Sequence, residues 1–312
     1  MRAVVYDSYG GPARWRDVPE LECPPAGAVI EVLATGVCRS DWHAWRGHDP
    51  VALPNTPGHE FAGVVAEVGP LVTGFAVGQR VTAPFVNGCG SCSYCAAGQA
   101  QVCPNQTQPG FTHAGSFAER VVVHQADLNL VALPDSLDCV TAAALGCRFA
   151  TSFHAVHVQG GLKAGEWLAV YGCGGVGLSA IMIGVAMGAQ VVAVDRSETA
   201  LERAAKLGAQ TVLSDDPATA VKEITAGGAH VSLDAVGSPA TSNAAVHSLR
   251  RKGRHVQVGL MLAENANASL PWSTVIAQEL VVAGSHGMAA ASYPHMLDLI
   301  TSGNLDPKRL VG

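Results

Sequence analysis

Four cysteines within fifteen residues have the spacing of a metal site. They form the pattern Cys89-x2-Cys92-x2-Cys95-x7-Cys103, among glycines that allow a loop to fold around an ion. Tetrahedral zinc takes four sulfur ligands at about 2.3 Å, and a fully ligated ion has no position left for a substrate. The spacing predicts a structural zinc lobe over about residues 88–104. One alternative is two disulfides, but neither the chain length nor the N-terminus fits a secreted scaffold. Another is a redox dithiol, but no thioredoxin-like βαβ pattern surrounds these cysteines.

A glycine-rich turn predicts a dinucleotide site. The segment Gly172-Cys173-Gly174-Gly175-Val176-Gly177 follows the apolar run Trp167–Tyr171 and opens an apolar helix near Leu178. Glycines permit unusual backbone angles and close approach to a pyrophosphate, while the helix N-terminus attracts the anion. Because a tight turn without a ligand can show the same pattern, further evidence is needed.

An acidic residue at the end of the next apolar run supplies that evidence. Asp195 lies 23 residues after Gly172, where a carboxylate can accept hydrogen bonds from both hydroxyls of an adenosine ribose. Its charge would repel a 2′-phosphate, although the adjacent Arg196 could partly offset this repulsion. The sequence therefore favours NAD over NADP as the cofactor. The alternative for Asp195 is an ordinary helix-capping acid.

Three further residues of metal-ligand type stand far apart in the sequence: Cys38, His59 and Cys147. Two thiolates and one imidazole leave the fourth position of a zinc ion to water or substrate, as in catalytic sites. Because a single cysteine or histidine is more often a packed core residue, the residues alone leave both interpretations open.

The elements that would position these residues change in character near residue 150. Before it, short β-rich runs such as Val29–Leu33, Gly63–Val68 and Phe117–His124 alternate with Gly/Pro turns. After it, apolar runs separated by helix-like segments imply an α/β fold with a doubly wound, six-stranded parallel sheet. These runs are Trp167–Tyr171, Gln190–Val194, Thr211–Leu213, His230–Ala235, His255–Leu260 and Leu280–Ala283. A helix is predicted over Ser197–Leu207, with Ser197 as its N-cap and Gly208 just beyond its end.

Length and composition exclude several classes of protein. The chain has 312 residues, 48% of them hydrophobic and 14% charged, which suits two well-filled domains and argues against disorder. A net charge of −6 without a long basic run argues against a nucleic-acid partner. The uncharged stretch Trp167–Val194 is long enough to span a bilayer, but its glycines fit strand, turn, helix and strand better. Met1–Gly11 lacks the features of a signal peptide, so we expect a cytoplasmic protein with no membrane partner.

Taken together and in this order, the motifs resemble those of the zinc-dependent medium-chain alcohol dehydrogenases over essentially the whole chain. The resemblance rests on Cys38-Arg39-Ser40-Asp41-x-His43, Gly58-His59-Glu60, the four-cysteine lobe, Gly146-Cys147 and the Gly172–Gly177 turn with Asp195. It implies a GroES-like β-rich catalytic domain over 1–150, a Rossmann NAD-binding domain over 151–287 and an active site in the cleft between them. It also implies NAD and two zinc ions per subunit.

The resemblance implies a role for each residue of the first motifs. Cys38, His59 and Cys147 would bind the catalytic zinc, with Glu60 as an alternate ligand. Asp41 would orient the imidazole of His59. Arg39 would contact the cofactor pyrophosphate, Ser40 would receive the proton of the substrate hydroxyl, and His43 would pass it to solvent. Asp41 could instead be a turn acid, and His43 a surface histidine.

Further positions are implied near the cofactor and the substrate. Thr151, Val258 and Leu260 match positions that flank nicotinamide in the family. Phe85, Phe111 and Trp45 match or neighbour pocket-lining positions, which favours an apolar or aromatic alcohol, although these rings could equally be core residues.

The implied activity is the interconversion of primary or secondary alcohols with aldehydes or ketones. Ser40 with His43 favours simple alcohols over the polyols and threonine of related dehydrogenases. A non-catalytic zinc protein that binds nucleotide is an alternative. A zinc-free quinone-type reductase is another, but such an enzyme would have no use for both sets of ligands.

The resemblance also implies a homodimer or homotetramer, with Leu280–Ala283 as the pairing edge. Members of the family usually continue beyond the point where this chain stops. We therefore expect 288–312, with a helix over Tyr293–Thr301, to begin a return to the catalytic domain that is either truncated or completed differently.

Overall fold

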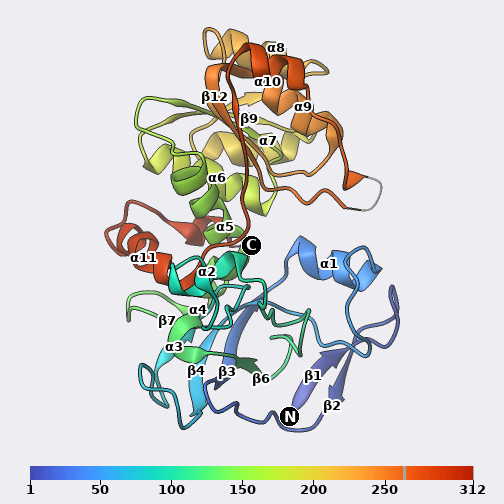
Figure 1. Ribbon diagram of the computed structural model, residues 1–312, viewed down its shortest axis with the longest axis vertical. Coiled ribbons are helices and arrows are strands. Elements are labelled where there is room, and N and C mark those ends of the chain that lie inside the picture. The colour runs from blue at the N-terminus through green and yellow to red at the C-terminus, as the bar shows by residue number, and fades with distance from the viewer. Residues whose placement is uncertain (263–264, 312) are drawn as a thin grey trace. The chain divides into compact units, whose positions relative to one another are not determined.

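The computed structural model describes residues 1–262 and 265–311 and divides the chain into two compact units (Figure 1). The first unit consists of Met1–Ala150 together with Gly287–Gly312, and the second of Thr151–His286. Within the described residues, no helix combines the length and the apolar character needed to cross a membrane.

Antiparallel β-structure dominates the first unit. A five-stranded sheet has the strand order β6-β3-β4-β5-β7, and β1 and β2 pair separately. The strands are β1 Arg2–Val5, β2 Arg14–Asp17, β3 Ala28–Gly36, β4 Glu60–Val68, β5 Arg80–Thr82, β6 Arg120–Val123 and β7 Val131–Ala132. Apolar side chains of the sheet, such as Ile30, Phe61 and Val121, are fully buried. The expected β-rich domain is confirmed.

Short helices carry the functional segments of this unit. They are α1 Arg39–Arg46, α2 Ser93–Ala96, α3 Ala126–Asn129, α4 Cys139–Ala143 and α11 Tyr293–Thr301, with a π-helical turn over Leu145–Phe149 and 3-10 turns over Ala100–Val102, Ala290–Ser292 and Pro307–Leu310. The helix predicted at Tyr293 has the expected bounds. The buried Tyr293 hydroxyl donates to the Leu145 carbonyl at 3.2 Å, so the last segment of the chain packs beside the π-helical turn.

The second unit is built on a six-stranded parallel sheet, as expected. Its order is β10-β9-β8-β11-β12-β13, so the direction of winding reverses between β8 and β11, where doubly wound folds bind ligands. The strands are β8 Trp167–Tyr171, β9 Gln190–Val194, β10 Gln210–Val212, β11 Ala229–Asp234, β12 Leu249–Gln257 and β13 Val281–Gly284.

Five helices connect or follow the strands of this sheet. A sixth, α5, precedes the sheet and contains the division between the two units. The helices are α5 Ala150–Phe153, α6 Gly175–Ala186, α7 Glu198–Lys206, α8 Pro217–Ile224, α9 Pro239–His247 and α10 Trp272–Ala277, with a π-helical turn over His154–Gln159. The predicted helix at Ser197 is confirmed as α7, because the Ser197 hydroxyl accepts from the Ala200 N–H and Gly208 adopts φ +101°. The uncharged stretch Trp167–Val194 forms β8, α6 and β9.

Three elements have boundaries that differ from expectation for an identifiable local reason. The first is β12, which ends at Gln257 because the next two N–H groups, of Val258 and Gly259, both donate to the Asp234 carbonyl. This strand also begins earlier than expected, at Leu249 instead of His255, because the basic run Arg250–Lys252 is part of it, with Lys252 at φ +59°.

The other two differences involve β6 and α6. Strand β6 does not include Phe117 or Glu119, whose N–H groups donate to Pro57 and Arg2. Helix α6 starts at Gly175 rather than near Leu178, since Gly174 is its N-cap and the glycine-rich turn forms the first helical turn.

Candidate active site and cofactor-binding turn

Cys38, His59 and Cys147 come together in the first unit. Their ligand atoms all lie within 4.8 Å of one another, and the two Sγ atoms are 3.9 Å apart. The His59 side chain is fully buried, and its Nδ1 atom lies 3.0 Å from Asp41 Oδ1. Because a carboxylate only accepts, Nδ1 donates to Asp41, and Nε2 is the nitrogen left to bind a metal. Among the described residues Nε2 has no hydrogen-bond partner, so a buried imidazole nitrogen and two sulfurs form a donor set that fits zinc.

Asp41 holds two of these ligands in place. Its Oδ2 atom accepts from the Cys38 N–H at 2.8 Å. Its Oδ1 atom accepts from the Gly58 N–H at 3.1 Å as well as from His59. One buried carboxylate in the first turn of α1 thereby fixes the backbone on both sides of the site and the tautomer of the histidine.

Each ligand lies at the end or in an irregular turn of an element. Cys38 is the N-cap of α1, and His59 immediately precedes β4. Cys147 lies in the π-helical turn Leu145–Phe149, a conformation that occurs mostly at functional positions. These positions turn side chains from three separate segments toward one point.

Electrostatics in this group favours one thiolate and a cationic imidazole. Burial opposes a charge on His59, but the hydrogen bond to Asp41 and the proximity of Cys38 raise the pKa of His59 to about 10. The hydrogen bond with Cys147 and the proximity of His59 lower the pKa of Cys38 well below its usual value, whereas the same bond and burial raise the pKa of Cys147. A metal ion that binds here must therefore displace protons from the imidazole and from Cys147.

Glu60 lies next to the ligands, but both of its oxygens are engaged by Arg148. The Oε1 atom accepts from the Arg148 N–H and Nε at 3.2 Å each, and Oε2 accepts from Nη2 at 2.6 Å. Burial and the nearby Cys38 raise the pKa of Glu60, while the Arg148 guanidinium opposes this shift. Glu60 is thus positioned beside the site by a partner that the sequence analysis missed. The signal was available, because Arg148 directly follows the ligand Cys147.

Helix α1 carries the three polar residues of the first motif. Ser40 Oγ is 3.8 Å from Cys38 Sγ, so this hydroxyl lies at the metal site. His43 is half-buried one turn further along. The Arg39 guanidinium lies over the Trp42 ring, 3.7 Å from its centroid, which fixes its direction.

Two of the three expected pocket aromatics flank the imidazole. The ring centroids of Phe111 and Phe85 lie 5.4 and 6.1 Å from that of His59, both edge to face. Trp45 packs against a small cluster with Tyr6 and Val51, as Phe111 also does, and its indole N–H donates to the Gly11 carbonyl at 2.7 Å. Phe85 and Phe111 thus contact the His59 ring, and Trp45 packs against the same small cluster as Phe111.

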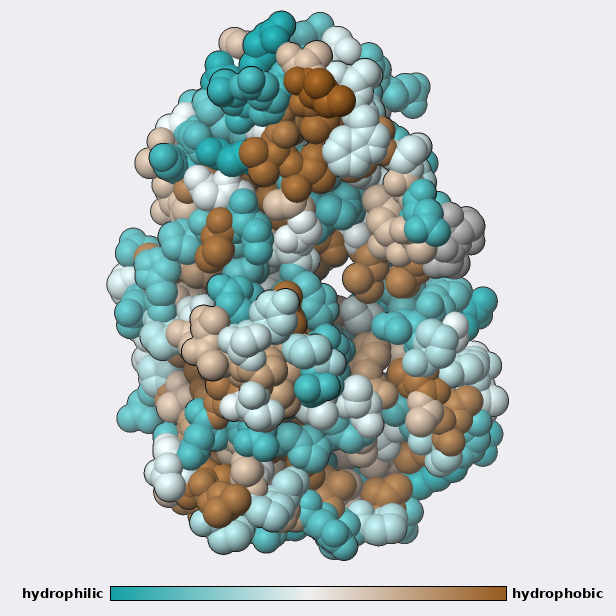
Figure 2. Space-filling view, viewed as in Figure 1, coloured by the Kyte–Doolittle hydropathy of each residue, from teal (hydrophilic) through white to brown (hydrophobic). Residues whose placement is uncertain are grey.

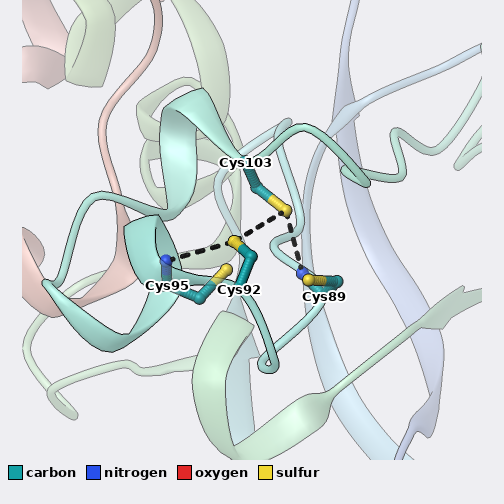
Figure 3. A group of neighbouring side chains, drawn as sticks. All are labelled: Cys89, Cys92, Cys95 and Cys103. Carbon is teal, nitrogen blue, oxygen red and sulfur yellow. Dashed lines mark hydrogen bonds between the residues drawn. The ribbon is translucent and has the colours of Figure 1, made fainter.

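The four-cysteine lobe also converges on one point. Cys89, Cys92, Cys95 and Cys103 turn their sulfurs toward a common centre (Figure 3), within 4.8 Å of one another. Backbone N–H groups of Cys89, Cys95 and Asn105 donate to these sulfurs at 3.3–3.4 Å, as expected for thiolates. Four sulfurs complete a tetrahedral zinc site, which makes this site structural.

Buried Asn129, which no sequence motif predicts, anchors the start of this lobe. Its side chain accepts from the Gly88 N–H at 2.8 Å and donates to the Gly88 carbonyl at 3.0 Å. A single asparagine carries no sequence signal for such a role.

The glycine-rich turn of the second unit has the geometry of a phosphate cradle. Gly172 adopts φ +93°, and a Cβ on Gly177 would lie 1.7 Å from the Gly172 carbonyl oxygen. Only glycine fits both positions. Around Gly174 a Cβ would meet nothing within 4 Å, so the N-terminus of α6 faces free space suited to an anion. The Val176 carbonyl accepts from the Ser152 hydroxyl at 2.8 Å, which ties the first turn of α6 to α5.

The other expected cofactor residues lie at the ends of strands or helices of the same unit. Asp195 directly follows β9, with exposed Arg196 beside it. Val258 and Leu260 follow β12, and Leu260 is exposed. Thr151 is buried, and its hydroxyl has no partner among the described residues.

Comparison with known proteins identifies the family. The model of the alcohol dehydrogenase GroES-like domain matches residues 24–135, and that of the zinc-binding dehydrogenase matches residues 175–302. An alcohol dehydrogenase of Geobacillus stearothermophilus is 39% identical over 266 residues, which cover 83% of this chain and 78% of the relative. The chain belongs to the zinc-binding medium-chain alcohol dehydrogenase family.

Further relatives of this alcohol dehydrogenase family cover almost the whole chain. A sorbitol dehydrogenase of Halalkalibacterium halodurans is 33% identical over 100% of this chain and 91% of its own length. The solved alcohol dehydrogenase TADH from Thermus sp. ATN1 has a TM-score of 0.92 at 33% identity, covering 99% and 91% of the two chains. A solved NAD-dependent alcohol dehydrogenase has a TM-score of 0.87 at 30% identity, covering 98% and 90%.

Family membership and geometry agree on the class of protein. The chain is an alcohol dehydrogenase-type oxidoreductase with a structural four-cysteine site and a catalytic Cys-His-Cys site, so it holds two zinc ions.

Proposed function

We propose that this chain is an NAD-dependent enzyme that interconverts simple primary or secondary alcohols with aldehydes or ketones. The observation that carries the proposal is the buried, unpartnered Nε2 of His59 beside Cys38 and Cys147. Cys38, His59 and Cys147 would hold a zinc ion, which would supply acidification of the substrate hydroxyl, and bound NAD would supply the hydride acceptor.

The residues of the chain bind the cofactors and move the proton. The Gly172–Gly177 turn and the N-terminus of α6 bind the pyrophosphate, and Asp195 accepts the ribose hydroxyls. Ser40 Oγ takes the proton of the substrate hydroxyl, and His43 passes it outward. Arg39 binds the pyrophosphate, and Thr151, Val258 and Leu260 flank the nicotinamide. Glu60, held by Arg148, serves as the alternate ligand.

The two aromatic rings beside His59 support a substrate with an apolar or aromatic body. Phe85 and Phe111 add apolar surface where the substrate would bind. A polyol is the second candidate, because a sorbitol dehydrogenase is 33% identical over the full chain. A panel that compares benzyl alcohol, butanols and sorbitol with NAD, followed at the absorbance of reduced nicotinamide, distinguishes the two by kcat/KM.

The test of catalysis is the Cys147→Ala variant. A zinc-dependent dehydrogenase loses turnover and one zinc per chain, but its affinity for NAD stays unchanged, because the glycine-rich turn lies in the other unit. If the protein instead binds zinc and nucleotide without catalysis, the unmodified protein also shows no turnover. The Cys139→Ala variant, outside both sulfur clusters, is the matched control.

A homodimer or homotetramer belongs to the same proposal. Strand β13 lies at the edge of its sheet and includes exposed Val281, and Trp272 and Ile276 of the preceding helix α10 are also exposed. Figure 2 shows an apolar patch at the top of the view, over the region of α10. An unpaired strand edge with apolar neighbours suits pairing with a second copy. A cytoplasmic location is also part of the proposal, because it would keep the nine free cysteines reduced.

A further inference from the structure

A second histidine lies against His43 at the end of helix α1. The Nδ1 atoms of His43 and His48 are 3.2 Å apart. No motif of the sequence and no step of the proposed mechanism includes His48, which is exposed while His43 is half-buried.

The backbone at the end of α1 creates this contact. Gly47 takes φ +74°, the Gly47 N–H donates to the Ala44 carbonyl at 3.0 Å, and the His48 N–H donates to the His43 carbonyl at 2.9 Å. This pair of bonds is a Schellman motif, which sets the side chains of residues 43 and 48 next to each other. The Trp42 ring packs edge to face on both imidazoles, with centroids 5.0 and 5.2 Å away. The pair is therefore held by the helix end rather than by chance contact.

The short distance between two ring nitrogens allows one hydrogen between them. One Nδ1 must donate and the other accept. If His43 donates, its Nε2 has a lone pair ready to accept a proton, and His48 carries an Nε2–H on its exposed ring. Among the described residues, neither ring has another side-chain hydrogen bond.

The surroundings of His43 disfavour a lasting positive charge on it. Burial lowers the pKa of His43, and so do the charge of Arg39 and the presence of His48, whereas Asp49 and Cys38 act in the opposite direction. If His43 accepts a proton, it avoids this unfavourable positive charge only by releasing a second proton at the same time.

We propose that His48 is the proton-transfer partner of His43. This inference rests on the proposed function. As His43 Nε2 accepts a proton, the Nδ1 proton of His43 moves to His48 Nδ1, and His48 releases its Nε2 proton to water. One proton enters the pair and one leaves, both rings change tautomer, and neither remains charged. In carbonyl reduction the same steps run in reverse.

The kinetic test uses His48→Gln in the zinc-loaded enzyme. Glutamine can accept the hydrogen bond from His43 but cannot pass a proton on, so positioning is kept while transfer is lost. We expect the single-turnover rate of NAD reduction near neutral pH to fall about tenfold, less than the ~10²-fold typical of a lost acid–base group, because water can partly replace an exposed ring.

Rescue and a matched variant separate transfer from structure. Added imidazole restores the rate of His48→Gln, and KM for alcohol and NAD is unchanged. The His247→Gln variant, which replaces an exposed histidine of the second unit, is the control. Unchanged rates across the pH profile, or a loss that imidazole does not restore, overturn the proposal.

The second test does not depend on turnover. Nitrogen-15 NMR of histidine-labelled, zinc-loaded protein reports which ring nitrogens carry hydrogen. We expect one protonated Nδ1 in the His43–His48 pair, which stays on His43 in His48→Gln because the glutamine oxygen accepts it, and two Nε2–H tautomers in the parent protein would overturn the proposal. A parent enzyme that oxidises no alcohol instead rejects the proposed function, while the NMR result still decides whether the pair shares a proton.

Discussion

The Asp195 carboxylate accepts a hydrogen bond from the backbone N–H of Cys173 at 2.7 Å. The end of β9 is thereby tied to the glycine-rich turn that follows β8. The other carboxylate oxygen accepts from the Ser197 N–H at 2.9 Å, at the start of α7. One acidic side chain thus shapes the phosphate cradle and, in the proposed function, also receives the ribose hydroxyls.

Replacing Asp195 with alanine should change the choice of cofactor. We expect the Kd for NAD to rise about tenfold to a hundredfold, since hydrogen bonds to a charged acceptor are lost. NADP should lose less affinity, because the repulsion of its 2′-phosphate disappears together with the carboxylate. Fluorescence titration of both nucleotides measures the ratio. Asp215→Ala, at an exposed acid of the same unit, is the control, and an unchanged NAD/NADP ratio removes Asp195 from this role.

Asp41→Asn should weaken zinc binding at the Cys38 site. Three N–H groups, of Cys38, Gly58 and the His59 ring, converge on the two oxygens of Asp41. Asparagine has one oxygen, so a buried donor loses its acceptor and the His59 tautomer is no longer fixed. We expect a tenfold to hundredfold lower zinc affinity, about the usual effect for a partner of a histidine ligand. Competition with a chelator measures it, with exposed Asp17→Asn as the control. Equal affinities in the two variants contradict a positioning role.

The sequence predicted those features that depend on a local pattern of residue types. Cysteine spacing located the zinc lobe, and apolar runs located all six strands of the parallel sheet because strands buried on both faces read as continuous hydrophobic segments. Strand β12 was placed too late because its first residues, Arg250–Lys252, are charged and break that pattern.

Side-chain contacts between residues far apart in the sequence could not be predicted from the sequence alone. The pairs Glu60–Arg148 and Asn129–Gly88 join residues 88 and 41 positions apart, and no local pattern shows which distant residue is the partner. The same holds for Trp45, since a tryptophan near a motif has the same sequence signature in a pocket as in a core. Its indole bond to Gly11 is likewise a contact between residues far apart in the sequence.

Loss of the structural zinc should destabilise the first unit more than it affects the chemistry. Cys103 is buried, and its sulfur accepts N–H groups from Cys89 and Asn105, so Cys103→Ser removes a ligand and weakens the loop around it. We expect one zinc lost per chain and a Tm lower by about 5 °C or more, as for a loss of a few kcal/mol. Metal analysis and calorimetry measure both. Cys23→Ser, outside the lobe, should keep both zinc ions, and an unchanged Tm in Cys103→Ser would show that the lobe is stable without its metal.

Acid should destabilise the first unit partly through His113. Its Nε2–H donates to the Val122 carbonyl at 3.2 Å, and burial, together with nearby His124, lowers the pKa of His113 to about 4. The unfolded chain, with an ordinary histidine pKa near 6.5, then binds more protons than the folded chain between these values. Stability is therefore complete above about pH 6.5 and falls as the pH drops toward 4, by up to about 3 kcal/mol for this side chain. His113→Gln keeps a donor for Val122 but does not titrate, so its free energy of unfolding should fall less steeply over this range. Denaturant unfolding at several pH values measures the slope, with His247→Gln as the matched control, and parallel curves for parent and His113→Gln assign the acid sensitivity to other groups.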